Sequence, residues 1–190
     1  GSTIHFGNKG VLAETEIGVI GHINKLKLGF AWHSHTRYSL TDISSYSMIN
    51  HWKNGGINDA YSQDSYFEYI IKTPSRILAS TALILGKKVI ISNDYERVNY
   101  GSGRLENEEF YVADFSGQNQ AVENTFTASH QFRQGIEVRI SKKFRARLGE
   151  TFTTTPYSEN AEVASDEYSW GYSFGGEFRN DKFYAGFAFT

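Results

Sequence analysis

The sequence predicts an all-β protein, an antiparallel up-and-down β-barrel with about eight strands present in the chain. Three features predict it. Apolar and polar residues alternate with a period of two in about eight segments. Aromatic residues make up 15 % of the 190 residues, and aromatic side chains are enriched in strands. Short turns also alternate with long connections along the chain, as in a barrel whose hairpin turns share one end.

The first hairpin is predicted from two alternating segments, residues 16–23 and 26–33, around the tight turn Asn24-Lys25. A taller segment follows at residues 66–85. Its strand is expected to break or kink near Thr73-Pro74, because proline has no N–H to donate to a ladder.

A turn at residues 86–88 leads from this tall segment into a strand at residues 89–99. The last two hairpins repeat the design: residues 135–140 and 144–149 around Lys142-Lys143, and residues 170–179 and 183–189 around Asn180-Asp181. We expect a β-bulge near Gly175-Gly176, where the alternation is irregular. The stretches 39–65, 101–123 and 158–166 are predicted to be long polar loops.

Composition limits the class of protein. With 39 % hydrophobic and 21 % charged residues the chain can bury a core, and its formal charge of −2 argues against a nucleic-acid partner. The absence of cysteine excludes disulfides, thiolate catalysis and zinc-thiolate sites. We interpret residues 1–2 as a tag remnant and residues 3–190 as a single β-barrel domain or a barrel fragment.

Short turns at one end and long loops at the other favour a barrel that spans a membrane. The mixture of glycine and both signs of charge on the polar faces agrees with a lumen. A soluble, lipocalin-like barrel that binds a lipophilic ligand gives the same alternation, with the apolar face inward. A structural barrel whose loops serve adhesion is a third hypothesis. The side on which the apolar residues lie separates the first two: Leu26, Leu28, Phe30, Ile136, Val138 and Phe174.

The stretch from Arg76 to Tyr100 reads RILASTALILGKKVIISNDYERVNY. It resembles the FadL/TodX-type outer-membrane transporters of hydrophobic compounds, in which a strand ends in a Gly-Lys turn and the next carries Asp-Tyr-Glu and then Tyr. Further matches run in order over nearly the whole chain: residues 38–42, Thr73-Pro74, residues 135–139, residues 147–149, residues 155–157, and residues 171–179 followed by Phe183-Tyr184.

The resemblance implies a fourteen-stranded barrel in the outer membrane of a Gram-negative bacterium, of which this chain would be the C-terminal half. Its partners would be long-chain fatty acids or other hydrophobic small molecules, and outer-membrane lipid. The implied route leaves the barrel sideways through an opening at a strand kink, for which Thr73 and Pro74 are the candidates. The chain departs from the family at residues 33–36, where a Thr-Pro step is common, and at Glu150, where an aromatic residue is common.

Five residues are candidates for ligand binding. His33 and His35 share a parity, so their imidazoles could lie about 7 Å apart and share a metal. Two hydrogen-bonded histidines are the simpler interpretation, since no third metal ligand is visible, and no metal or cofactor is expected. Arg139, Arg145 and Arg147 could bind a carboxylate head group. Alternatively they neutralise Glu137 and other acids inside the barrel.

We expect no enzyme and no catalytic residue. Asp94 and Glu96 are two positions apart on one strand face and superficially resemble a catalytic carboxylate pair, but we interpret them as members of lumen salt bridges. Ser129 and His130 are adjacent in a strand and therefore point to opposite faces, which does not support a catalytic triad.

Overall fold

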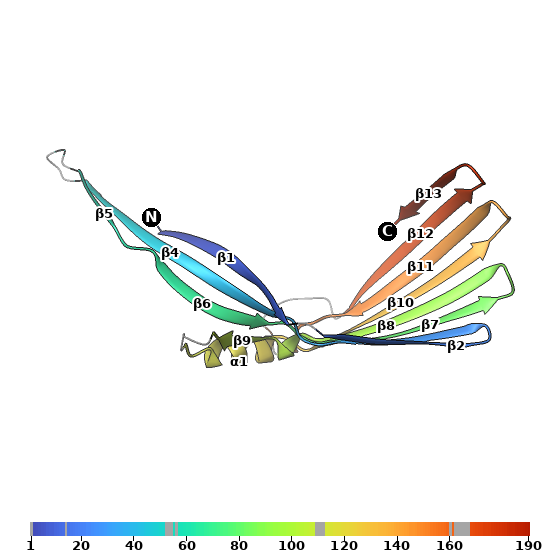
Figure 1. Ribbon diagram of the computed structural model, residues 1–190, viewed down its shortest axis with the longest axis horizontal. Coiled ribbons are helices and arrows are strands. Elements are labelled where there is room, and N and C mark those ends of the chain that lie inside the picture. The colour runs from blue at the N-terminus through green and yellow to red at the C-terminus, as the bar shows by residue number, and fades with distance from the viewer. Residues whose placement is uncertain are drawn as a thin grey trace.

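The computed structural model describes residues 2–13, 15–51, 55, 57–108, 113–159, 161 and 168–190. They form two antiparallel sheets that meet at a bend (Figure 1). The larger sheet has eight strands in the order β13 (Tyr184–Phe189), β12 (Tyr168–Arg179), β11 (Phe144–Thr154), β10 (Ala128–Arg139), β8 (Val89–Asn99), β7 (Arg76–Leu85), β3 (Leu26–His33) and β2 (Glu16–Ile23).

The smaller sheet has five strands. Its path is β1 (Ser2–Ala13), β4 (Arg37–His51), β6 (Ser65–Lys72) and β9 (Arg104–Asn107), and β5 (Ile57–Tyr61) pairs with β4. The 3-10 turn η1 (Tyr100–Ser102) and the helix α1 (Ser116–Thr125) complete the described elements. The all-β class is therefore confirmed, apart from one short helix. No helix in the described part of the chain is long and apolar enough to cross a membrane.

The four predicted hairpins are confirmed as β2–β3, β7–β8, β10–β11 and β12–β13. Their turns lie side by side at one end of the large sheet (Figure 1). Backbone bonds join them: Ile84 donates to the carbonyl of Lys25 at 2.8 Å, and Arg139 to that of Lys88 at 2.6 Å. This confirms that the short turns share one end.

The order of strands is kept through the bend. β2, β3, β7 and β8 are neighbours in the large sheet. The strands next to them in the sequence, β1, β4, β6 and β9 respectively, are neighbours in the same order in the small sheet. Strand β6 ends at Lys72 and β7 begins at Arg76, so Thr73 and Pro74 lie in the break. Thr73 N–H donates to the carbonyl of Thr36 at 2.9 Å, and Thr36 N–H donates to Thr73 Oγ1 at 2.9 Å. One backbone and one side-chain hydrogen bond thus connect Thr36 with Thr73 where the ladder is interrupted.

Helix α1 covers the free edge of β9. The Asn119 carboxamide accepts from Leu105 N–H at 2.8 Å and donates to the Leu105 carbonyl at 3.0 Å, as a neighbouring strand would. Arg104 pairs with Glu123 of the helix at 3.0 Å. Gly101 permits the close approach at this corner, because a Cβ there would lie 2.5 Å from the Phe126 carbonyl oxygen. Covering an edge strand in this way hinders sheet-to-sheet aggregation.

Three local predictions are wrong. Residues 39–65 are mostly the β4–β5 and β6 strands, and residues 101–123 hold η1, β9 and most of α1. The polar character of β4 misled the prediction, since Ser39 and Thr41 are buried polar residues. No bulge occurs at Gly175-Gly176, which pair in unbroken register with β11. The predicted loop 158–166 lies largely outside the described residues.

The large sheet is open: within the described residues no pairing joins its edge strands β2 and β13. Ile70 is the one apolar side chain found buried in the described part of the chain. The accessible surface is 14083 Å². A soluble globular monomer of 21.5 kDa would expose only about 9,200 Å². The molecule therefore leaves an extended apolar surface uncovered.

Candidate functional site

The eight-stranded sheet has one apolar face. Residues that pair directly across strands point to the same side of a sheet, so the register defines whole rows of side chains. One row takes an apolar residue from every strand: Ile23, Leu26, Leu83, Ile91, Ile136, Leu148, Phe174 and Phe189. The next row toward the turns continues it with Leu85, Val89, Val138, Ala146 and Phe187. We call this surface the apolar face.

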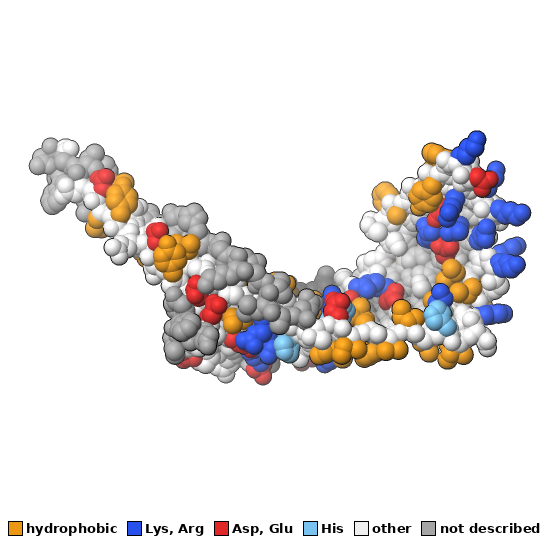
Figure 2. Space-filling view, viewed as in Figure 1, with side chains coloured by type: hydrophobic (Ala, Val, Ile, Leu, Met, Phe, Trp, Pro, Cys, Tyr) orange, Lys and Arg blue, Asp and Glu red, His pale blue; other side chains and the backbone are white. Residues whose placement is uncertain are grey.

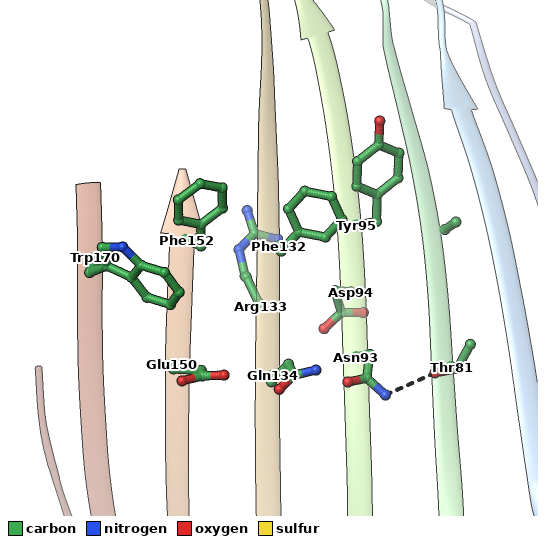
Figure 3. A pocket seen from close by; sticks show the side chains of 11 residues that line it. Thr81, Asn93, Asp94, Tyr95, Phe132, Arg133, Gln134, Glu150, Phe152 and Trp170 are labelled. Carbon is green, nitrogen blue, oxygen red and sulfur yellow. Dashed lines mark hydrogen bonds between the residues drawn. The ribbon is translucent and has the colours of Figure 1, made fainter. Parts of the chain in front are cut away.

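A polar row interrupts the apolar face on its other side. It consists of Thr81, Asn93, Gln134 and Glu150 on four neighbouring strands, with Asn93 Nδ2 donating to Thr81 Oγ1 at 3.2 Å (Figure 3). The following row is aromatic, with Tyr95, Phe132, Phe152 and Trp170. Together these two rows line a groove of about 480 Å³. A carboxylate, two carboxamides and a hydroxyl thus lie beside a surface suited to an acyl chain or a ring.

The opposite face of the large sheet, the polar face, carries a closed cluster of four charges near the turns. Arg147 donates from Nε to Glu137 at 2.7 Å and from Nη2 to Glu177 at 2.6 Å. Arg145 lies 3.5 Å from Glu177 and 3.8 Å from Glu137. Two cations and two anions alternate around this cluster, so their formal charges cancel. Glu177 is buried among them, with 5 % of its side chain exposed.

A second line of polar contacts crosses the polar face near the bend. Glu16 lies 2.6 Å from Nδ1 of His33, and Arg76 lies 3.4 Å from the same nitrogen. Arg76 also reaches Glu96 at 4.0 Å, and Glu96 pairs with Arg133 at 2.8 Å. The line runs over five strands, from β2 to β10. Figure 2 shows charged side chains on the inner side of the sheet's curve and hydrophobic ones along its lower edge.

Small residues lie between these two polar clusters. Gly135 and Gly149 pair with each other, and Ser92 and Ser173 flank them. A Cβ on Gly149 would meet Ser173 Oγ at 2.7 Å, so the serine side chain occupies the space above the glycine. The result is a hollow of about 490 Å³ on the polar face, bounded by Glu137 and Arg147 on its turn side. This hollow is the candidate ligand path.

The predicted ligand residues do not form one site. Arg145 and Arg147 are both engaged by two carboxylates, whereas Arg139 forms no ion pair with a described acid and donates to the Ser141 carbonyl at 3.3 Å. His33 lies on the polar face at the bend, and His35 is exposed in the segment after β3. Among the described residues, no group of three or more His, Asp and Glu side chains could hold a metal.

Sequence reasoning missed the polar row. Thr81, Asn93 and Gln134 lie far apart along the chain and are unremarkable in their own strands; only the cross-strand register aligns them with Glu150. The signal that could have found them is the parity of each residue in its strand, extended across the two hairpins β7–β8 and β10–β11.

These features define an all-β protein with a two-faced, uncovered sheet. No protein-family model matches the chain, and no curated protein matches its sequence.

Proposed function

We propose that the eight-stranded sheet is the wall of an outer-membrane β-barrel through which long-chain fatty acids or other hydrophobic small molecules pass. The observation that carries this proposal is the uncovered apolar face, to which every strand of the sheet contributes. A transmembrane barrel turns its apolar residues outward, where lipid covers them, so a membrane would cover such a face. The resemblance to FadL/TodX-type transporters agrees with it.

Exposure favours this proposal over a soluble barrel. Leu28, Phe30, Ile136, Val138 and Phe174 have exposed fractions between 37 % and 53 %. Burying such a side chain contributes roughly 1.5–3 kcal/mol, which a soluble fold would not leave unused at so many positions. Charged side chains also occupy the inner side of the curve in Figure 2, where a lipocalin-like barrel would hold its apolar ligand.

The height of the apolar face also supports a membrane location. Along β11 this face runs from Phe144 to Phe152, with the polar row at Glu150 inside it, and its eight residue steps cover about 27 Å. A strand tilt of about 40° reduces this to roughly 21 Å, near the apolar band of about 25 Å in outer-membrane barrels. Aromatic residues lie at both limits of the band, with Phe144 and Phe178 near the turns and Phe132, Phe152 and Trp170 near the bend.

On the lumen side, the hollow over Gly135 and Gly149 offers a path whose walls are small side chains. Of the three predicted arginines, Arg139, near the turns, is the one available to a carboxylate, since Arg145 and Arg147 each face two acids. Each CH₂ that leaves water on the way contributes about 0.8 kcal/mol. The strand break at Thr73-Pro74 is the candidate point of sideways exit, bridged by the Thr36–Thr73 bonds.

The first experiment is purification with and without detergent, followed by size exclusion and by gel mobility before and after boiling. We expect a monodisperse, heat-modifiable species in detergent only. A folded monomer in plain buffer would refute the membrane location and leave the soluble barrel.

The second experiment tests the passenger. Binding of a fluorescent long-chain fatty acid to the detergent-folded chain is compared for wild type, Arg139→Gln and Gly149→Val. The valine should obstruct the hollow and the glutamine should weaken capture of the carboxylate. An ester of the same chain length serves as a control, because Arg139→Gln should leave its binding unchanged. Unaltered fatty-acid binding by both variants would contradict this path.

A further inference from the structure

The hairpin turns carry a concentration of positive charge. Each of the four turns at this end contributes lysine, and we call these six lysines the turn-end rim: Lys25, Lys87, Lys88, Lys142, Lys143 and Lys182. All six side chains are exposed. In Figure 2, Lys and Arg side chains stand along the right-hand edge of the molecule, where Figure 1 places the four turns. The near-zero net charge of the chain hides this local excess.

The charge of the rim is uncompensated. Asp181 is the one acidic residue within the four turns, and none of the six lysines forms an ion pair with a described acid. Arg139 and Arg179 add two more exposed cations where β10 and β12 end. The turns are also held together, since Arg179 N–H donates to the carbonyl of Lys143 at 2.8 Å. The cations therefore form one continuous surface.

The opposite end of the molecule has the other sign. Its exposed or half-buried acids include Asp42, Asp59, Asp64, Glu106, Glu108 and Glu123. Its cations are largely engaged: Arg37 and Lys72 both reach Glu106, and Arg104 reaches Glu123. Among the described residues, unpaired lysines therefore gather at the turn end, whereas Arg37, Lys72 and Arg104 at the opposite end are each paired with an acid.

The rim borders the apolar face. Leu85, immediately before the turn that holds Lys87 and Lys88, is 44 % exposed on that face, and Phe144, immediately after Lys143, is 50 % exposed. Lysine places its aliphatic stem along apolar surface while its ammonium reaches a polar phase. At the border of a hydrocarbon layer, that polar phase consists of lipid headgroups.

We propose that the turn-end rim binds the anionic headgroups of phospholipids in the leaflet at that end of the barrel, and so fixes which end of the protein enters an anionic leaflet. This inference rests on the proposed membrane location. A basic side chain near an anionic membrane surface raises partition by about fivefold. The rim repeats that contribution around all four turns, while the acidic end is repelled from the same surface.

The test uses the whole chain and vesicles of two compositions, pure phosphatidylcholine and phosphatidylcholine with phosphatidylglycerol. Binding is measured by flotation, and insertion by heat-modifiable mobility and protection from protease. The variant replaces four rim residues, Lys87→Gln, Lys88→Gln, Lys142→Gln and Lys143→Gln. Its matched control places arginine at the same four positions, which preserves the charge. Circular dichroism in detergent verifies that all three proteins fold.

For wild type and the arginine variant we expect at least tenfold stronger binding to the anionic vesicles, reduced at high salt because exposed charges are screened. The glutamine variant should lose most of that difference. Equal binding to both compositions, or a glutamine variant that behaves as wild type, would overturn the proposal. If the anionic preference persists without insertion, headgroup binding by the rim stands, while its role in orienting the barrel fails together with the proposed function. If insertion occurs with no preference, the rim proposal fails and the proposed function stands.

Discussion

At the scale of single residues, the geometry makes Glu177 the centre of the charge cluster on the polar face. Its carboxylate is almost fully shielded and receives both arginines, while Glu137 is 24 % exposed. Removing one partner of a buried ion pair leaves the others uncompensated. The arginines are themselves a third or more exposed, so water screens part of that cost.

We therefore predict that Glu177→Gln lowers the free energy of unfolding by about 2 kcal/mol. Glu137→Gln should lower it by a smaller amount, because its carboxylate already meets water. Urea unfolding in detergent, followed by tryptophan fluorescence, measures both. Equal effects from the two substitutions would contradict the assignment of Glu177 as the centre of the cluster.

Asp114 provides a pH-dependent contact before α1. Its carboxylate accepts from Ser116 N–H at 2.9 Å, and hydrogen bonding from the side chain and then the backbone of Ser116 lowers the pKa of Asp114 below 3.8. A lowered carboxyl pKa means that the contact is present at neutral pH and is lost as the pH falls through that lowered value. The Ser116 amide resonance should therefore titrate with a midpoint below 3.8. In Asp114→Asn this titration should vanish; a midpoint at or above 3.8 would contradict the contact.

At the scale of elements, the hairpins of the large sheet were predictable, whereas the small sheet was not. Toward the turns, residues 136–139 of β10 and 144–148 of β11 alternate, because apolar side chains lie on one face of the sheet and charged or small ones on the other. In β4 that contrast is missing: Ser39 is 1 % exposed and bonds Glu108 at 2.9 Å, so a polar residue fills a buried position. Helix α1 has few apolar residues, and it is held by Asn119 and Glu123, whose partners lie in β9.

The residues of the candidate site were likewise predictable only in part. Sequence parity placed Glu137, Arg145 and Arg147 on one face, and the register then showed which acid meets which arginine. No local pattern revealed that Glu177 joins them from β12, nor that Gly149 lies under Ser173. These cross-strand neighbours depend on the register between one hairpin and the next. Side-chain alternation does not determine that register, because a shift of two residues leaves every side chain on the same face.

The polar row yields a prediction about β10. In a membrane, Gln134 would face lipid without a bonded partner among the described residues, so Gln134→Leu should raise stability in vesicles by about 1–2 kcal/mol. Gln131 is the matched control in the same strand on the opposite face, where its Nε2 donates to Thr153 Oγ1 at 3.1 Å. Gln131→Leu should lower stability. Urea unfolding in vesicles measures both; destabilisation by Gln134→Leu would indicate that a polar partner covers the row.

At the scale of the whole molecule, the excess surface and the open edges belong together. If the apolar face meets lipid, as we propose, both edge strands must be paired, because unpaired N–H and C=O groups are costly in hydrocarbon. In Figure 1, β2 and β13 lie at opposite sides of the large sheet. Either these two strands pair with each other after a tighter curl, or further strands come between them. The resemblance to a fourteen-stranded family favours the second arrangement.

Because the chain has no cysteine, disulfide trapping can decide between these arrangements. Cysteine pairs that join positions 17–20 of β2 to positions 185–188 of β13 should not cross-link in the membrane-inserted protein. Thr153→Cys with Ser169→Cys is the positive control, since these residues pair directly between β11 and β12. Cross-linking needs Cα atoms within about 7 Å, so a β2–β13 disulfide in high yield would mean that the eight strands close on themselves. Without it, the proposal that other strands complete the edges stands, and the hollow over Gly135 and Gly149 would then open into a lumen wider than eight strands can enclose.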